Sequence, residues 1–273
     1  MSRRVKIAGL AALVGIAAAV GVFLYIERIA KVAIERGASY ALGVPTAVDS
    51  VSISVLSGES GLKGLRVANP SGFATPHFLT LDEASLRLRL GSLREETIVV
   101  PLLVLKGIDV NLEWNNRKTN YGVVLGNLRR RQSGGPPPSG EPGTGRRFII
   151  DRLVIEDVTT RMRVAPLGGE LTTREVRIPE IRLTGIGSNS DRGVLLAELT
   201  GVVVTAILRA VAERGRGLPG ELASTLRGGL SGLERIPAEV LGEAGKAVGG
   251  AAPDLGERAR EALEEAGKLF KRR

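Results

Sequence analysis

Cysteine is absent from this chain of 273 residues, and aromatic residues make up only 3% of it. The absence of cysteine excludes disulfides, zinc–thiolate centres, iron–sulfur clusters and a thiol nucleophile. His77 is the only histidine, so a histidine pair for zinc or iron is excluded as well. Leu, Val, Ile and Ala must fill the core, which favours sheets and helices over an enzyme interior built from large side chains. We therefore expect no metal site and no cofactor.

Catalytic motifs are also missing. A Ser-His-Asp triad would have to use His77, which follows Thr75-Pro76 in a turn-like stretch, and no G-x-S-x-G motif supplies a nucleophile. The chain has four adjacent acidic pairs: Asp82-Glu83, Glu95-Glu96, Glu156-Asp157 and Glu264-Glu265. Neighbours on a strand point to opposite faces, although a glycosidase-like pair from two different strands stays open. We predict that the protein is not an enzyme and has no catalytic residues.

The formal net charge is +9, with a sequence pI of about 10.3. Such a balance permits binding to nucleic acid or to anionic lipid. The arginine and lysine runs lie at the ends of predicted elements and are not interleaved with aromatic residues along one helix. This distribution favours solvated ends or contacts with a membrane surface, and we predict no nucleic-acid partner.

The N-terminus contains 20 uncharged residues, Ile7 to Ile26, preceded by Arg3, Arg4 and Lys6. At about 1.5 Å per residue this run spans roughly 30 Å, the thickness of a bilayer's hydrocarbon core. Because positive flanks stay cytoplasmic, residues 1–6 are predicted to be cytoplasmic, 7–26 to be a transmembrane anchor, and the bulk of the chain to be periplasmic or extracytoplasmic. The alternative is a cleaved signal peptide, but apolar residues continue beyond its small residues Ala17 and Ala19.

Residues 27–45 are predicted to form a juxtamembrane helix that ends at Gly43-Val44-Pro45. From residue 46 the hydrophobic period changes to two, which is typical of strands with one apolar and one polar face. Nine apolar residues in three such segments are candidates for contact with lipid: Val51, Ile53, Val55, Leu86, Leu88, Leu90, Ile108, Val110 and Leu112. Pro101 should mark an edge or bulge, and Pro179 should shift a strand's register.

These segments predict a β domain over residues 46–192. Residues 133–145 hold nine glycines and prolines in 13 positions, and they predict a flexible loop. Apolar spacings of three and four predict a helix over residues 193–214, packed on the sheet or, alternatively, crossing the membrane. Residues 215–273 form a tail rich in Gly and Ala, weakly ordered up to Gly250 and helical from Asp254 to Phe270. The predicted fold class is mainly β with helices (α+β), with an antiparallel or mixed curved sheet that has one apolar face, and with C-terminal helices.

Several short motifs between Ala33 and Asn127 resemble those of one protein family. They are Gly43-Val44-Pro45, Val51–Gly58, the turn Asn69-Pro70-Ser71-Gly72-Phe73, the strand end Leu90-Gly91-Ser92-Leu93, and Ile108–Asn115. Together they resemble the N-terminal module of AsmA-like envelope proteins. The resemblance implies a bacterial inner-membrane anchor with an exported β module, in a superfamily that includes lipid-conducting proteins. The turn itself reads as structural, because Asn before Pro and a following Gly favour a turn.

Two functions follow as expectations. The first is a membrane-anchored, non-catalytic module for lipid handling or envelope organisation, in which the apolar sheet face contacts membrane lipid. The second is an assembly or scaffold protein, whose sheet face is covered by its own helix and whose partners are other envelope proteins.

Overall fold

A computed structural model describes residues 25–54, 57–115, 118–133, 146–164, 172–188, 193–214 and 220–231. The protein is mainly β with several helices, as predicted. Within these ranges, no helix is both long and apolar enough to cross a membrane. The predicted anchor lies outside the described residues except for Tyr25 and Ile26, as do the loop 134–145, Val55 and the predicted helix 254–270.

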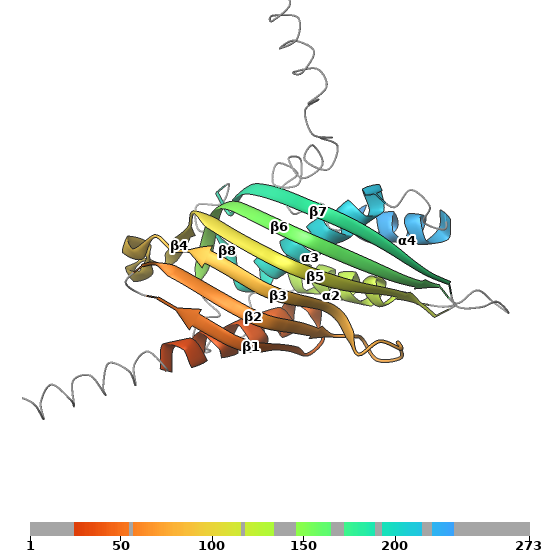
Figure 1. The fold of residues 1–273 in the computed structure, drawn as a ribbon, viewed down its shortest axis with the longest axis horizontal. Helices are drawn as coiled ribbons and strands as arrows, with labels where there is room; N and C mark the ends of the chain where they lie inside the picture. The colour runs from red at the N-terminus through yellow and green to blue at the C-terminus, as the bar shows by residue number, and fades with distance from the viewer. Residues whose placement is uncertain are drawn as a thin grey trace, which may run out of the picture.

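Eight strands form one mixed sheet (Figure 1). They are β1 (Thr46–Ile53), β2 (Glu59–Ala68), β3 (His77–Arg87), β4 (Thr97–Val100), β5 (Leu102–Trp114), β6 (Arg147–Val164), β7 (Thr172–Ile186) and β8 (Val194–Leu195). β1, β2, β3 and β5 pair as an antiparallel meander, and β5 pairs with β6 in parallel. β7 and β8 pair with the other side of β6.

Pro101 interrupts one line of pairing. β4 and β5 both pair in parallel with β6, β4 along its first residues and β5 along the rest, so they occupy one position in the sheet. Proline has no N–H to donate to a ladder, which explains why the strand breaks there. The parallel pairing of β5 and β6 requires a crossover, and α2 (Asn120–Ser133) forms the described part of it.

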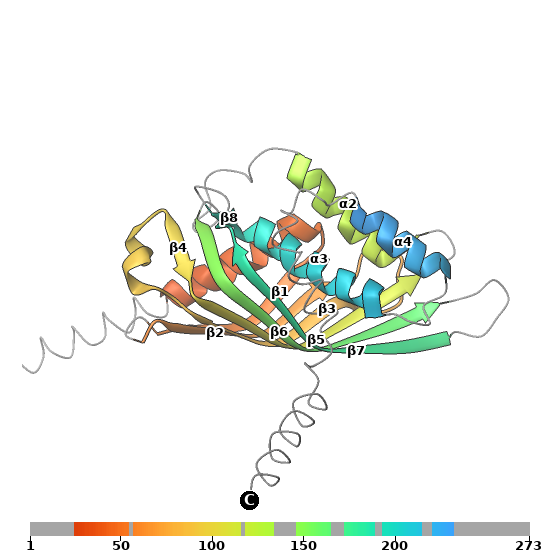
Figure 2. The ribbon, with the colours of Figure 1, turned by 90° about the horizontal axis from the view of Figure 1, so that it is seen from above.

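The α-helices of the described residues lie on the concave face of the sheet (Figure 2). A helix over residues 25–42 runs beside β1, and α3 (Leu196–Arg214) packs directly against β6 and β7. α2 and α4 (Gly220–Ser231) pack together and against α3, further from the sheet. The apolar side chains between these layers form one continuous hydrophobic core.

In every strand of the meander, the alternation of buried and exposed residues shifts by one residue, and these shifts lie at the same level of the sheet. On β5 the buried residues Leu105 and Ile108 are three apart instead of two, and Gly107 between them has φ of 71°. Asp157 on β6, with φ of 56°, lies beside it, followed by Pro179 on β7. The change occurs in each strand, so the pairing on both sides stays in register. The shift predicted at Pro179 is therefore a shift in which residues face the core, not in the strand pairing, and it is one part of a bend that crosses the sheet.

Glycine is required in this bend because carboxylates of the neighbouring strands lie over it. A Cβ atom at Gly107 would collide with the carboxylate of Asp82, and one at Gly64 would collide with that of Asp49. Both glycines also have positive φ, which other residues adopt at a cost. The kink leaves Asp82 and Glu83 both exposed, so the expectation that these neighbours point to opposite faces is wrong here.

Three local predictions differ from the structure. β3 ends at Arg87, and Leu90 begins the 3-10 helix η1 (Leu90–Arg94) instead of continuing a strand. α2 was not predicted, although Tyr121, Val124, Leu125 and Leu128 lie on one helical face and are buried. α4 lies in the segment predicted to be weakly ordered, where Leu226 and Leu230 are buried among the helices. Tertiary burial overrides the low helix propensity of its glycines.

Candidate functional site

The apolar face of the sheet is the surface that the strand pattern proposed for lipid, and most of it is internal. Ile108, Val110 and Leu112 on β5 are buried, with at most 4% of each residue exposed. They belong to the core that α3 and the other helices complete. These three residues therefore contact other residues of the same chain and leave no open surface along β5.

The candidates on the other strands are less covered. Val51, Ile53, Leu86 and Leu88 are partly buried, and Leu90 on η1 is exposed (41%). Val51, Leu86 and Leu88 still pack against the edge of the core. The eight predicted residues that the structure describes are thus divided between a sealed interior and a partly open end of the sheet, which carries η1. We call this end the η1 end.

The opposite end of the sheet is held by a polar cluster of Asn69, Thr75, Glu113 and Asn120, the Glu113 cluster, in which Glu113 and Asn120 are buried and the other two are partly buried. Glu113 Oε1 accepts hydrogen bonds from Asn69 Nδ2 (2.9 Å), the Thr75 amide (2.8 Å) and the Thr75 hydroxyl. Its Oε2 accepts one from the Ala74 amide (2.7 Å). The carboxylate of β5 therefore fixes the turn between β2 and β3.

Asn120 connects the same cluster to the start of α2. Its Oδ1 accepts from the amides of Glu113 (2.9 Å) and Tyr121 (2.8 Å), while its Nδ2 donates to Asn69 Oδ1 (3.0 Å) and to the Asn111 carbonyl (2.7 Å). Asn120 is fully buried, yet every polar atom of its side chain is satisfied. Such a fully connected network fixes one arrangement of strand, turn and helix.

Glu113 is ionised in this setting. Burial favours the neutral acid, but the hydrogen bonds from Thr75, Ala74 and Asn69 outweigh it and hold the pKa of Glu113 below its usual range. Oε1 accepts three hydrogen bonds and Oε2 accepts one, so the carboxylate uses most of its acceptor capacity within the cluster. The cluster is suited to a structural clamp. The interpretation of the Asn69–Phe73 turn as structural fits this geometry, and Glu113 is the partner that sequence reasoning missed.

His77 and the acidic pairs form no further reactive arrangement among the described residues. His77 is the first residue of β3, and its carbonyl accepts from Asn111 Nδ2 (3.0 Å). No group of three or more His, Asp or Glu side chains in the described ranges could hold a metal ion. On the outer face, Lys106 of β5 lies between Glu83 of β3 and Glu156 of β6, so opposite charges alternate there.

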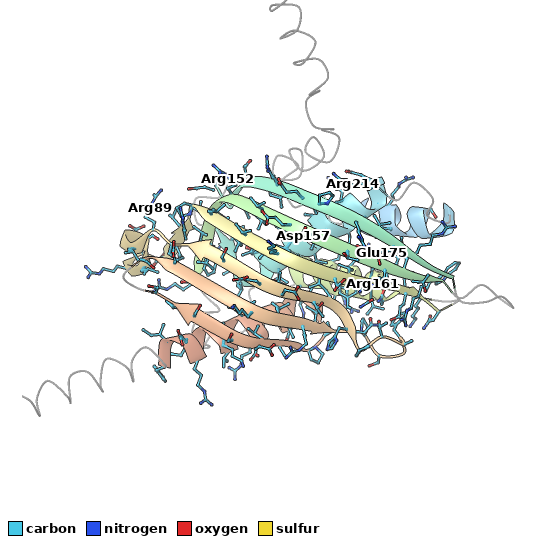
Figure 3. All side chains as sticks on the ribbon, in the orientation of Figure 1. Arg89, Arg152, Asp157, Arg161, Glu175 and Arg214 are labelled. Atoms are coloured by element: carbon cyan, nitrogen blue, oxygen red, sulfur yellow. The ribbon has the colours of Figure 1, made fainter. Side chains whose placement is uncertain are left out.

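The outer, convex face of the sheet is charged (Figure 3). Arg161 on β6 pairs with Asp109 on β5 (3.0 Å) and Glu175 on β7 (3.8 Å), and Glu175 also pairs with Arg177 (2.7 Å). Each of these side chains is at least 38% exposed. This face is therefore a solvated surface of mixed charge, in contrast to the apolar inner face.

The helix over residues 25–42 is bonded to the edge of β1. Glu35 Oε1 accepts from the Val48 amide (2.8 Å), Glu27 Oε1 from the Ile53 amide (3.2 Å), and Ser39 Oγ from the Thr46 amide (2.8 Å). β1 is an edge strand, so no strand pairs with it on this side. The helix side chains accept hydrogen bonds from its amides instead. The C-terminal end of the helix is also fixed, because Asn127 Nδ2 of α2 donates to the Leu42 carbonyl (2.7 Å). The segment that follows the predicted anchor is thus an integral part of the domain.

The chain matches no protein-family model and no curated protein. The AsmA-like resemblance therefore stays a prediction that rests on the motifs quoted above. Two of those motifs have a defined place in the fold: the Asn69–Phe73 turn sits on the Glu113 cluster, and Leu90–Leu93 lies within η1.

Proposed function

We propose that this protein is a single-pass membrane protein whose extracytoplasmic body is a non-catalytic organiser of the cell envelope. The supporting observation is the attachment of the helix 25–42 to β1 by Glu27, Glu35 and Ser39. A flexible tether would let the body move freely relative to the anchor, whereas a helix that is bonded to the domain and continues the anchor would hold the body in a fixed orientation. Fixed presentation of a surface is what an assembly or scaffold protein requires.

The sealed interior supports the scaffold function over a lipid conduit. A conduit needs an apolar surface that stays open to acyl chains, but Ile108, Val110 and Leu112 are covered by the chain's own helices. The hydrogen bonds that hold the Glu113 carboxylate on the turn and the single histidine support a non-catalytic role.

Membrane anchoring and orientation are tested together on the full chain. Ile16→Arg places a charge near the middle of the uncharged run, where it costs on the order of 3 kcal/mol. We expect the parent chain to stay in membranes after alkaline carbonate extraction and the variant to be released. Because the chain has no cysteine, Ser71→Cys in the exposed turn gives a single label site. It should react with a membrane-impermeant maleimide added outside the inner membrane.

Partner binding is tested by photo-crosslinking from the charged outer face in intact cells. A crosslinking residue in place of Arg177, which is exposed on β7, should capture one defined envelope protein. The matched control is the same residue in place of Leu183, which is buried. Equal capture from both positions, or none from the outer face, would remove the scaffold function.

Lipid handling is the second candidate, and the partly exposed η1 end favours it. Native mass spectrometry of the full chain released from detergent should then retain phospholipid. A variant with Leu88→Ser and Leu90→Ser should lose that lipid, and a chain that is free of lipid from the outset would leave the scaffold function alone.

A further inference from the structure

The exposed large hydrophobic side chains of the described residues are Tyr25 (67%), Ile26 (37%) and Leu90 (41%). Tyr25 and Ile26 begin the helix over residues 25–42, and Leu90 begins η1. The start of this helix and η1 lie at the same end of the sheet in both views (Figures 1 and 2). Exposed apolar side chains are thus gathered at one end and not scattered over the surface.

A series of contacts links Leu90 to Glu27, the residue that follows Ile26. A Cβ at Gly58 would lie 3.4 Å from Leu90 Cδ2, so Leu90 lies against the turn after β1. The Gly58 amide donates to the Ser54 carbonyl (2.9 Å), and the preceding residue, Ile53, donates its amide to Glu27 (3.2 Å). Leu90 and the start of the helix therefore border the same turn.

Charged side chains of both signs border η1, with arginines in a small excess. The exposed charged residues nearest to it include Arg87, Arg89, Arg94, Arg146, Glu59, Glu95 and Glu96. Glu59 is paired with Arg87 (3.8 Å). Arg146 donates to the carbonyls of Leu93 (2.9 Å) and Glu95 (3.2 Å), which keeps a positive charge against η1. Apolar side chains with arginines at their rim are typical of protein surfaces that enter the interface of an anionic bilayer.

We propose that the η1 end is a membrane-contact surface that rests on an anionic bilayer, with Leu90 inserted among the headgroups. This inference depends on the proposed anchoring, because the uncharged run Ile7–Ile26 ends where the described helix begins. The anchor brings its own bilayer to this end, and arginines match anionic lipid. The sheet then extends away from the membrane, with the Glu113 cluster and Trp114 at its distal end.

The distances along β5 allow a direct test. β5 runs from Leu102, paired with Arg87 near η1, to Trp114, the only tryptophan of the chain. At about 3.3 Å per residue these 12 steps span roughly 40 Å. A tryptophan at position 90 and the native Trp114 therefore report on opposite ends of the sheet.

The experiment reconstitutes the full chain in vesicles of phosphatidylcholine and phosphatidylglycerol, with or without brominated acyl chains. The reporter carries Leu90→Trp and Trp114→Phe, and the matched control is the parent chain with Trp114. We expect brominated lipid to quench the reporter severalfold and to leave Trp114 unchanged. Adding Arg89→Glu and Arg94→Glu to the reporter should restore its fluorescence, while Arg163→Glu, at the distal end of β6, should not.

The outcomes separate the two proposals. If the chain floats with the vesicles but the reporter is not quenched, or Trp114 is quenched equally, the membrane contact is wrong and the anchoring stands. If the chain does not float with the vesicles, the anchoring fails and the contact fails with it. Quenching that is insensitive to Arg89→Glu and Arg94→Glu would overturn the role of anionic lipid.

Discussion

The two ends of the sheet are built differently. At the distal end, Leu112 is 4% exposed, and the Glu113 cluster bonds a turn, a strand and a helix into one unit. At the η1 end, Leu90 is 41% exposed, and the side chains of Ile53 and Leu88 are only partly covered. The same alternating pattern of apolar residues thus produces a sealed core at one end and an accessible apolar surface at the other. Tertiary packing decides the difference, because Leu112 lies in the core beneath the helices and Leu90 lies on η1, outside that core.

The largest expected difference in the free energy of unfolding is between two truncations of leucine to alanine, one at each end of the sheet. Leu112→Ala should lower the free energy of unfolding by about 2–5 kcal/mol, because it leaves a cavity in the packed core. Leu90→Ala should change it by less than about 0.5 kcal/mol, as is usual for an exposed side chain. Urea unfolding of the full chain in detergent, followed by Trp114 fluorescence, measures both. Equal losses would show that the η1 end is packed as tightly as the core.

Loss of the Glu113 charge should loosen the distal end. Glu113→Gln weakens the bonds from Ala74, Thr75 and Asn69 and should cost about 1.5–3 kcal/mol, the range for hydrogen bonds to a charged group. The same unfolding measurement applies, with Glu213→Gln on the exposed side of α3 as the control.

The pH dependence of stability should change in the same variant. The folded pKa of Glu113 is below the unfolded value of about 4.3, so its contribution is complete above that value and is lost as pH falls towards the folded pKa. Glu113→Gln should therefore reduce the loss of stability below about pH 4.3. If the free energy of unfolding falls equally steeply with decreasing pH in the parent chain and in the variant, Glu113 is not the source of this pH dependence.

The edge of β1 should respond locally. Glu35→Ala removes the acceptor of the Val48 amide and should cost about 1 kcal/mol. Hydrogen exchange at Val48 should accelerate severalfold, while exchange on β6 stays unchanged. Exchange that accelerates equally across the sheet would show that the helix 25–42 stabilises the whole fold and not this edge alone.

The ion pairs of the outer face should contribute least to the free energy of unfolding. Arg161→Ala removes ion pairs with Asp109 and Glu175, but these side chains are 38–44% exposed, so the cost should be below about 1 kcal/mol. Because salt screens exposed charges, the difference should shrink as ionic strength rises. A larger, salt-independent cost would place Arg161 in the structural framework of the sheet.

The sequence predicted the fold class because periodicity is a local property. Alternation in β1, β5 and β7 and the breaks at Pro101 and Pro179 could be interpreted without neighbours. It did not predict α2, whose apolar spacing lies directly after a strand, or α4, whose glycines disfavour an isolated helix. Nor did it predict Glu113, since its partners Asn69, Ala74 and Thr75 lie 38 to 44 residues away.

By itself the sequence determined that the strands have one apolar face, that disulfides and zinc–thiolate sites are excluded, and where the uncharged N-terminal run ends. Only the tertiary structure decided which part of that apolar face is interior. An alternating strand presents the same pattern to a helix of its own chain, to a partner or to lipid, because hydrophobic burial is not directional. Ile108, Val110 and Leu112 lie in the core that the helices complete, whereas Leu90 lies on η1, outside that core, and is exposed.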